Sequence, residues 1–277
     1  MKTVNSLSGG KTSSYMATHY PADYEIFSLV RIEDKKCSPP KWLRKKVEDK
    51  LGMDFIATAE DDKTLIVMFD LEQKLGREIT WVSGKTFDEV NKSGKGKDGL
   101  YSLPNMMWRF CTTQMKMEPI FKWWQMAFDG EIVEMRCGYR YDEKERANSF
   151  KTSMHAIVGR SKTGNQNKWD DVEWRVGYFP LIHWRINHFH VKEWADKSGL
   201  IFPIDSNCVG CFWKSPQQLR KNWEDNPTKM EWFAKEERDR KRTFKKEMSY
   251  DQIKTLGLQQ DFNFGEGSGC QAGFCTD

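Results

Sequence analysis

Strand-like and helix-like segments alternate along the first half of the chain. Short apolar runs are separated by segments with the apolar spacing of amphipathic helices, one of which begins at proline and ends at glycine. This alternation is typical of a parallel β-sheet covered by helices on both faces. We therefore predict an α/β fold with strands over residues 3–7, 24–32, 54–59, 78–84 and 131–139 and helices over residues 11–20, 39–52, 62–76 and 119–128.

The character of the sequence changes near residue 180. Beyond it, aromatic and basic residues dominate predicted helices, with cysteines between them. We predict an α/β nucleotide-binding domain over residues 1–180 and a mostly helical region over residues 181–277 that packs on it. Two stretches rich in glycine, lysine and small polar residues, 91–99 and 159–171, are predicted to be polar loops.

Composition limits the class of protein. The 277 residues suit one large domain, or a domain with a smaller appendage. No apolar run approaches the length of a membrane span, and no signal-like segment precedes the first strand, so we expect a cytoplasmic protein with no membrane partner. Seven cysteines in such a chain are expected to be reduced thiols or metal ligands. The net charge of +4 permits a nucleic-acid partner without requiring one.

The stretch that joins the first predicted strand to the first predicted helix reads SLSGGKTSSY, residues 6–15. Its glycines allow a positive φ and the close approach of a ligand to the backbone. A helix N-terminus adds N–H donors and the positive end of a dipole, and the lysine adds a charge. We predict that this stretch binds phosphate, with an ordinary Gly-Gly turn as the alternative. The residues involved are Ser8, Gly9, Gly10, Lys11, Thr12 and Ser13.

Two other groups of residues are candidates for binding, a cysteine pair for a metal and an arginine pair for an anion. Cys208 and Cys211 have the Cys-x-x-Cys spacing with which two thiolates bind one metal or cluster; the alternative is an adventitious pair. Arg140 and Arg146 follow a predicted strand, with Glu143 between them. Arginine forks suit phosphate or carboxylate recognition, and solvated charge pairs on a surface loop are the alternative.

Six segments, in order, resemble blocks of the phosphoadenosine phosphosulfate (PAPS) reductase family, a branch of the PP-loop adenine-nucleotide superfamily. The first resembles the pyrophosphate loop of that superfamily, and the fourth resembles a Gly-x-Arg-x-x-Glu-x-x-Arg block. Residues 214–277 are not covered by the resemblance. The segments are SGGKTSS (8–14), WVSGKTFDEV (81–90), RFCTTQMKMEPI (109–120), GYRYDEKERA (138–147), FPLIHWRINHFHVKEWADKSGL (179–200) and NCVGCFW (207–213).

The resemblance implies a PP-loop fold and an adenine-nucleotide site. Because the Ser-Gly-Gly-Lys loop is intact, it favours ATP with Mg²⁺ over PAPS. It adds Ser83 and Gly84 to the nucleotide-binding residues and Cys111 to the cysteines, with Cys275 or Cys270 as a fourth ligand. The cofactor implied is a [4Fe–4S] cluster, with Zn²⁺ as the alternative. The residues implied in catalysis are Lys11, Lys116, Arg140 and Arg146.

The sequence also departs from the family pattern at three places. Thr12 stands where the superfamily loop usually has an acid that helps with the metal or ribose side. Residues 111–112 are Cys-Thr, whereas iron–sulfur members carry Cys-Cys, and the C-terminus lacks the Glu-Cys-Gly tail of PAPS reductases. Thr12 bears on how Mg²⁺ would be bound, and the Cys-Thr pair bears on whether an iron–sulfur cluster is bound. The missing tail bears on the reductase reaction.

Three functions follow from the resemblance. The first is an ATP-dependent enzyme that adenylates an acceptor, such as a nucleic acid, for sulfur transfer, with a sulfur donor or reductant protein as partner. The second is a sulfonucleotide (PAPS or APS) reductase. The third is a non-catalytic adenine-nucleotide-binding module, which Thr12 favours. We expect the first, because the intact phosphate loop suits ATP.

Overall fold

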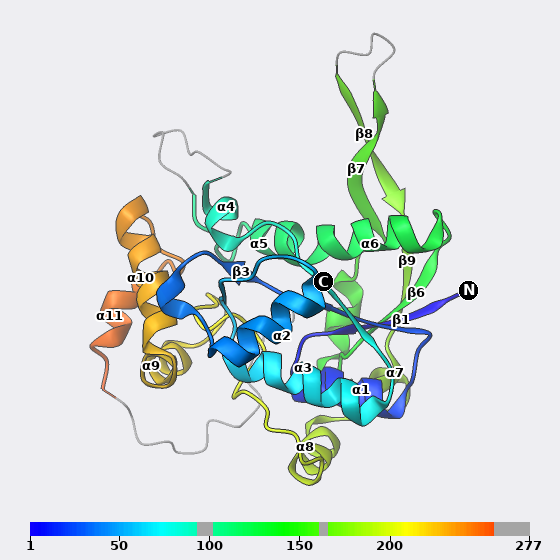
Figure 1. The fold of residues 1–277 in the computed structure, drawn as a ribbon, viewed down its shortest axis with the longest axis horizontal. Helices are drawn as coiled ribbons and strands as arrows, with labels where there is room; N and C mark the ends of the chain where they lie inside the picture. The colour runs from blue at the N-terminus through cyan, green and yellow to red at the C-terminus, as the bar shows by residue number, and fades with distance from the viewer. Residues whose placement is uncertain (93–101, 161–165, 258–277) are drawn as a thin grey trace.

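The computed structural model describes residues 1–92, 102–160 and 166–257 and contains a five-stranded parallel sheet (Figure 1). All neighbouring strands of this sheet run parallel. The predicted α/β architecture is therefore confirmed. The strand order is β5 (Ile79–Val82), β2 (Tyr24–Ser28), β1 (Thr3–Leu7), β6 (Val133–Cys137) and β9 (Arg175–Tyr178).

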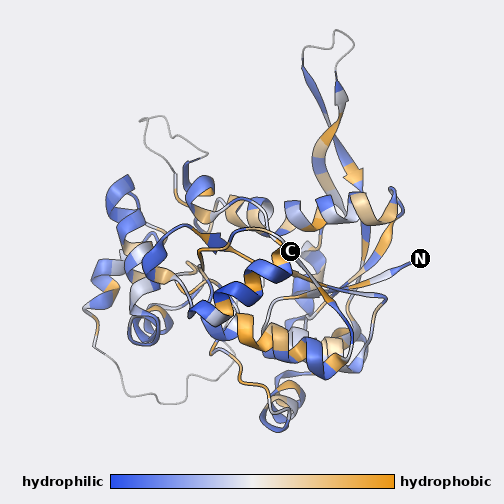
Figure 2. Ribbon diagram, in the orientation of Figure 1, coloured by the Kyte–Doolittle hydropathy of each residue, from blue (hydrophilic) through white to orange (hydrophobic). Residues whose placement is uncertain are grey.

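Helices cover both faces of the sheet. Side chains alternate along β1, so that Leu7 packs with one set of helices and Val4 with another. The Leu7 face is covered by α1 (Lys11–His19), α2 (Lys41–Leu51) and α3 (Asp62–Leu75), and the Val4 face by α6 (Glu118–Phe128). These helices carry apolar residues on part of their surface and hydrophilic residues elsewhere, as Figure 2 shows.

The predicted strand over residues 24–32 is broken into two, which corrects the prediction. After β2 the chain leaves the sheet and forms β3 (Arg31–Ile32), which pairs antiparallel with β4 (Ala57–Thr58). The predicted strand over 54–59 thus lies outside the main sheet. Both short strands are buried in a separate core made largely with the C-terminal helices. An apolar run indicates burial but not the partner against which it is buried, which explains the error.

The predicted polar loop over residues 159–171 is also wrong in most of its length. Its described residues belong to an antiparallel hairpin of β7 (Ser153–Arg160) and β8 (Asn167–Glu173), which projects from the sheet in Figure 1. Because both strands are largely exposed, they lack the apolar alternation that identifies a half-buried strand. Residues 93–99 of the other predicted loop lie outside the described residues.

The described residues after 180, up to residue 257, are mostly helices and loops. Three of these helices, with α4 (Phe87–Lys92), β3 and β4, enclose a core of their own. No helix in the described ranges is both long and apolar enough to cross a membrane. The helices after residue 180 are α7 (Pro180–His183), α8 (His188–Lys197), α9 (Pro216–Asp225), α10 (Pro227–Arg240) and α11 (Tyr250–Lys254).

Candidate functional site

The SGGK stretch forms a tight loop between β1 and α1, at the carboxyl edge of the sheet. Gly9 has a φ of 72°, and a Cβ there would lie 2.4 Å from Thr64 Cγ2. A Cβ on Gly10 would lie 2.6 Å from Ser206 Oγ. Both positions therefore require glycine, the first for its conformation and both for the close approach of another segment.

The loop ends at the N-terminus of α1. Gly10 is its N-cap and no side chain caps the helix, so the N–H groups of Lys11, Thr12 and Ser13 have no intrahelical acceptor. Ser13 Oγ holds the loop closed, because it accepts from Ser8 N at 3.2 Å and donates to the Gly10 carbonyl at 3.2 Å. Three free N–H groups beside a lysine can hold an anion such as phosphate.

The loop that follows β6 brings one arginine to this site. Gly138 packs on the backbone of Ser13, with a built Cβ 3.2 Å from Ser13 Cα. Arg140 Nη1 then donates to Thr12 Oγ1 at 3.2 Å. Since β2 lies on one side of β1 and β6 on the other, the site is at the point where the strand order reverses, where open α/β sheets bind ligands.

Arg146 is linked to the phosphate loop through Glu143 and Arg140. Both it and Arg140 form ion pairs with Glu143, at 3.4 and 3.0 Å, and the Arg146 guanidinium lies 4.3 Å from the ring centre of Tyr139. These residues belong to or adjoin the 3₁₀ segment η3 (Tyr141–Ser149). The structure therefore brings Arg140 to the loop and holds Arg146 behind it through Glu143.

Ser83 and Gly84 follow β5, two strands away from β1. Ser83 Oγ donates to the Leu29 carbonyl at 3.0 Å and accepts from Arg31 Nε at 2.8 Å. A Cβ on Gly84 would lie 2.6 Å from the Gln114 carbonyl oxygen. Ser83 therefore contacts the segment that follows β2, and Gly84 packs on the segment that carries Cys111 and Lys116.

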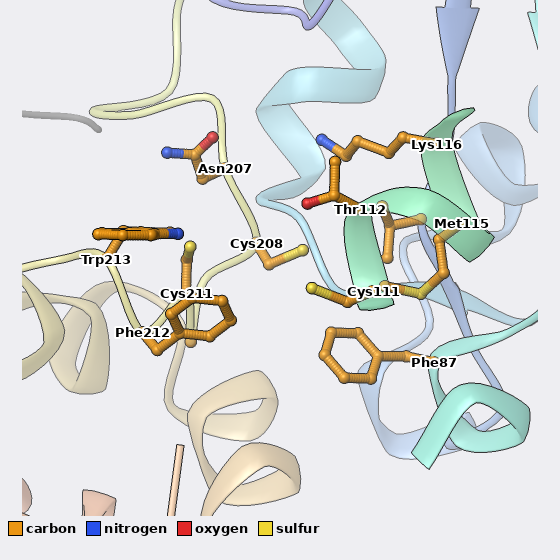
Figure 3. Close-up of a pocket in the computed structure, with 12 residues that line it drawn as sticks. Phe87, Cys111, Thr112, Met115, Lys116, Asn207, Cys208, Cys211, Phe212 and Trp213 are labelled. Carbon is orange, nitrogen blue, oxygen red and sulfur yellow. The ribbon is translucent and has the colours of Figure 1, made fainter. Parts of the chain in front are cut away.

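Three cysteines face one cavity of about 40 Å³, formed where the C-terminal helices meet the sheet. Cys111 comes from the short helix α5 (Phe110–Thr112), and Cys208 and Cys211 come from a turn between α8 and α9. Figure 3 shows the sulfur atoms of Cys208 and Cys111 pointing toward each other, with the sulfur of Cys211 on the other side of Cys208, near Trp213. Lys116 lines the same cavity. Lys116 belongs to a π-helical turn, η2 (Thr113–Met117).

The Cys208–Cys211 turn is fixed by close packing. Cys211 N donates to the Cys208 carbonyl at 3.0 Å, and Tyr250 Oη donates to the Gly210 carbonyl at 2.8 Å. A Cβ on Gly210 would lie 2.4 Å from the ring of Phe233, so only glycine fits there. The turn is also anchored to the sheet side, because Val209 N donates to the Ala59 carbonyl at 2.7 Å.

Burial is the main cause of the raised pKa values of these thiols. It raises the pKa of Cys111 to about 11, with a smaller contribution from the neighbouring Cys211. Burial, followed by the Glu60 carboxylate, raises the pKa of Cys208 well above its usual range. Burial lowers the pKa of Lys116, but Glu60 at 3.2 Å and Cys208 outweigh it, so this pKa is raised and the lysine stays charged.

Cysteine thiolates are ligands for soft cations such as zinc and iron. Three partly buried thiols that oppose one another's ionisation would be stabilised as thiolates by a bound metal. Within the described ranges, no three histidine, cysteine or acidic side chains lie so that they could hold one metal ion, so the three thiols do not form a metal site as they are placed. Cys270 and Cys275, the candidates for a fourth ligand, lie outside the described residues. Cys37 and Cys137 are buried elsewhere in the fold.

One segment links the phosphate loop to the cysteines. Ser206 lies against Gly10, and its hydroxyl is 3.5 Å from Ser8 Oγ. Cys208 is two positions further along, so its Cα lies within about 7.6 Å of that of Ser206. Any ligand phosphate held by the loop is therefore next to the segment that carries two of the three thiols.

Sequence reasoning missed Ser206, Asn207 and Glu60. Glu60 is fully buried, forms an isolated antiparallel bridge with Cys208 and pairs with Lys116. Glu60 gave no distinct signal, because it begins the acidic run Glu60–Asp62 at the start of a helix, where acids are expected for their favourable interaction with the helix dipole. Ser206 and Asn207 gave none, because a serine and an asparagine beside a cysteine turn are ordinary loop residues.

Comparison with protein-family models, curated proteins and solved structures finds no match for this chain.

Proposed function

We propose that this chain is an ATP-dependent enzyme of the PP-loop, PAPS-reductase type that adenylates an acceptor for sulfur transfer. The observation that carries the proposal is the closeness of the SGGK loop to the cysteine cavity through Ser206 and Cys208. A nucleotide-binding module needs only the loop, and a zinc-stabilised fold needs only the cysteines. An enzyme that activates an acceptor and then supplies sulfur needs both next to each other.

The residues at the loop suit cleavage of ATP at the α-phosphorus. In this proposal the free N–H groups of α1 and the Lys11 ammonium hold the phosphates, and Arg140 balances their charge from the β6 side. An oxygen of the acceptor attacks the α-phosphorus, and pyrophosphate leaves with the electron pair of the broken bond. Positioning and charge neutralisation are the main catalytic tasks in such a reaction. Mg²⁺ would share the charge of the leaving group.

Cys111, Cys208 and Cys211 would hold the metal group. A [4Fe–4S] cluster with three protein ligands would supply a site for sulfide, whereas a zinc ion closed by a fourth cysteine would be structural. In the completed reaction, sulfide displaces AMP from the adenylated acceptor, so that the acceptor oxygen leaves with AMP and sulfur takes its place. Lys116, held by Glu60, would keep a positive charge beside the thiolates.

The products formed from nucleotides test the proposal. Protein purified without oxygen is incubated with α-labelled ATP and Mg²⁺, or with PAPS, in the presence of total RNA or DNA. Release of pyrophosphate and AMP from ATP supports the proposal. Release of sulfite from PAPS identifies the sulfonucleotide reductase instead, and binding of ATP without any product identifies a binding module.

Lys11 provides the matched variant. Lys11→Ala removes a charge at the phosphate loop and should weaken ATP binding about 10- to 150-fold, the usual range for a lost charge-assisted contact. Lys45→Ala removes an exposed charge on α2 and should leave binding unchanged. Equal ATP affinity in the two variants, measured by calorimetry on folded protein, would count against the loop assignment.

A further inference from the structure

His188 lies near the phosphate loop, although it belongs to the region after residue 180. It is the first residue of α8. The segment just before this helix is tied to the loop that follows β6, because Tyr141 N donates to the Ile186 carbonyl at 2.8 Å. Arg140 directly precedes Tyr141, and His188 is two positions after Ile186, so its Cα lies within about 7.6 Å of that of Ile186. This hydrogen bond therefore holds the start of α8 beside Arg140.

The same helix also packs on α1, which begins at the phosphate loop. Tyr15 and His19 of α1 contact Trp194 of α8, with ring centres 5.6 and 6.2 Å apart. The ammonium of Lys11, at the start of α1, is close enough to His188 to act on its charge. The imidazole therefore lies in the field of both cations that the site directs at phosphate.

Charged groups from three elements act on this imidazole. Burial, followed by the guanidinium of Arg140, lowers the pKa of His188. Lys11 of α1 and Lys192 of α8 also lower this pKa, whereas Asp142 of η3 raises it. The net effect is a lowered pKa, so His188 is uncharged near pH 7 in the protein without a ligand.

Neither His188 nor Lys11 has a protein partner that accounts for its position. Both side chains are half-buried, and within residues 1–92, 102–160 and 166–257 no hydrogen bond or ion pair of the His188 ring or of the Lys11 ammonium is recorded. The capping bonds at the start of α8 are made by Asn187 and His190 instead. An imidazole and an ammonium without partners, beside a loop suited to phosphate, indicate an anionic ligand that both contact.

We propose that His188 is a phosphate-binding residue of the nucleotide site, which donates to a phosphate oxygen from the α8 side and becomes protonated when the nucleotide binds. This inference rests on the proposed function, to which it adds a residue and a dependence on pH. The negative charge of the phosphates favours the imidazolium form and opposes the effect of Lys11 and Arg140. Nucleotide binding therefore takes up a proton from solvent near neutral pH. The contact also joins the region after residue 180 to the nucleotide.

A nucleotide that cannot be cleaved between its α and β phosphates tests the contact. α,β-Methylene-ATP with saturating Mg²⁺ is titrated into the parent protein and into His188→Gln by calorimetry at pH 6 and pH 8. Glutamine keeps a hydrogen-bond donor but cannot gain a charge. The affinity of the parent relative to this variant should rise about threefold or more from pH 8 to pH 6, because uptake of one proton allows up to about tenfold per pH unit. An unchanged ratio would overturn the proposal.

His190 provides the matched control on the same helix. It is exposed, and its ring bonds to the N-cap residue Asn187. His190→Gln keeps a side chain that can close the capping box, so this variant should bind the analogue as the parent does at both pH values. His188→Ala, which removes the contact, should weaken binding about 2- to 10-fold at pH 8 and more at pH 6. Equal losses in His190→Gln and His188→Gln would show an effect through the fold of α8 and would overturn the contact.

Proton uptake gives a second measurement, which begins with the unmodified protein. Calorimetry at pH 7 in two buffers of different ionisation enthalpy gives the number of protons bound together with the analogue. The parent should take up more protons than His188→Gln, because protons bound by the analogue itself are the same in both titrations. Equal uptake by the two proteins would contradict protonation of His188.

The results separate this proposal from the proposed function. Binding of the analogue that depends on His188, in a protein that forms no pyrophosphate or AMP from ATP, would refute adenylation and leave the His188 contact standing. Release of pyrophosphate from ATP, with the same pH dependence of analogue binding in the parent and in folded His188→Gln, would refute the contact and leave adenylation standing.

Discussion

The contact between Gly10 and Ser206 gives a quantitative test of the site. Gly10→Ala would place a methyl group 2.6 Å from Ser206 Oγ and 2.7 Å from Ser206 Cβ. Gly10 has φ −96° and ψ 166°, which alanine adopts without strain. The cost therefore comes from overlap, about 1–3 kcal/mol for a close-packed contact, and from replacing glycine at an N-cap, which costs about 0.5–1 kcal/mol.

A second substitution separates the two costs. Ser206→Gly removes both clashing atoms, and the nearest remaining atom to the new methyl group is then Ser8 Oγ at 3.6 Å, an ordinary contact. The double variant should regain the overlap cost but not the N-cap cost. Ser206→Ala keeps the Cβ at 2.7 Å and should restore little, so it serves as the matched control.

Urea unfolding of the parent, the single variants and the double variants measures this coupling. We expect a coupling free energy of about 1–3 kcal/mol between Gly10→Ala and Ser206→Gly. ATP affinity should fall in Gly10→Ala and recover in the double variant, because the same overlap displaces the loop. Additive effects on unfolding would show that the Ser206 segment does not lie on the phosphate loop, and the link to the cysteines would fail with it.

Three other predictions address separate parts of the molecule. Burial raises the pKa of Glu237 to about 7, so between pH 4.5 and 7 the folded protein keeps a proton that the unfolded chain has released. The free energy of unfolding should therefore fall as the pH rises from 4.5 to 7. Glu237→Gln should remove this contribution to the pH dependence, measured by urea unfolding at several pH values. Arg140→Ala should lower ATP affinity in calorimetry with little change in melting temperature, because Glu143 keeps its second partner Arg146 and Asp142 is exposed to solvent; a large loss of stability with normal binding would contradict this. Cys208→Ser should abolish visible absorbance or bound zinc in anaerobically purified protein, whereas Cys37→Ser should keep it; equal metal content in both would refute the three-cysteine site.

Much of the architecture could be predicted from local sequence signals. The glycines at 52 and 76 adopt the left-handed conformation that ends α2 and α3, and the Gly-Gly pair marks the loop after β1. The errors over residues 24–32 and 54–59 arose because the sequence shows that an apolar run is buried but not which segment it pairs with. The β3–β4 pair and the β9 edge strand depend on contacts between segments far apart in the chain, which residue spacing does not encode.

The candidate site also combines features that local sequence patterns reveal with features that depend on long-range packing. The SGGK loop and the Cys-x-x-Cys turn are local patterns and could be read directly. Cys111 joined them only through a resemblance, and its place beside Cys208 and Cys211 depends on how two distant segments pack. The role of Glu60 was not predicted, because its bridge to Cys208 spans nearly 150 residues of sequence.

The segment before and within the cysteine turn is held by side chains more than by regular secondary structure. Lys214 is 1% exposed, pairs with Asp205 at 2.6 Å and donates to the Val209 carbonyl at 3.1 Å. It therefore ties the two ends of the stretch that contains Ser206, Asn207 and Cys208. Breaking a buried ion pair costs about 3–5 kcal/mol, so this stretch has one strongly favoured conformation. These contacts help to set the position of the segment between the phosphate loop and the cysteine cavity, as the proposed function requires.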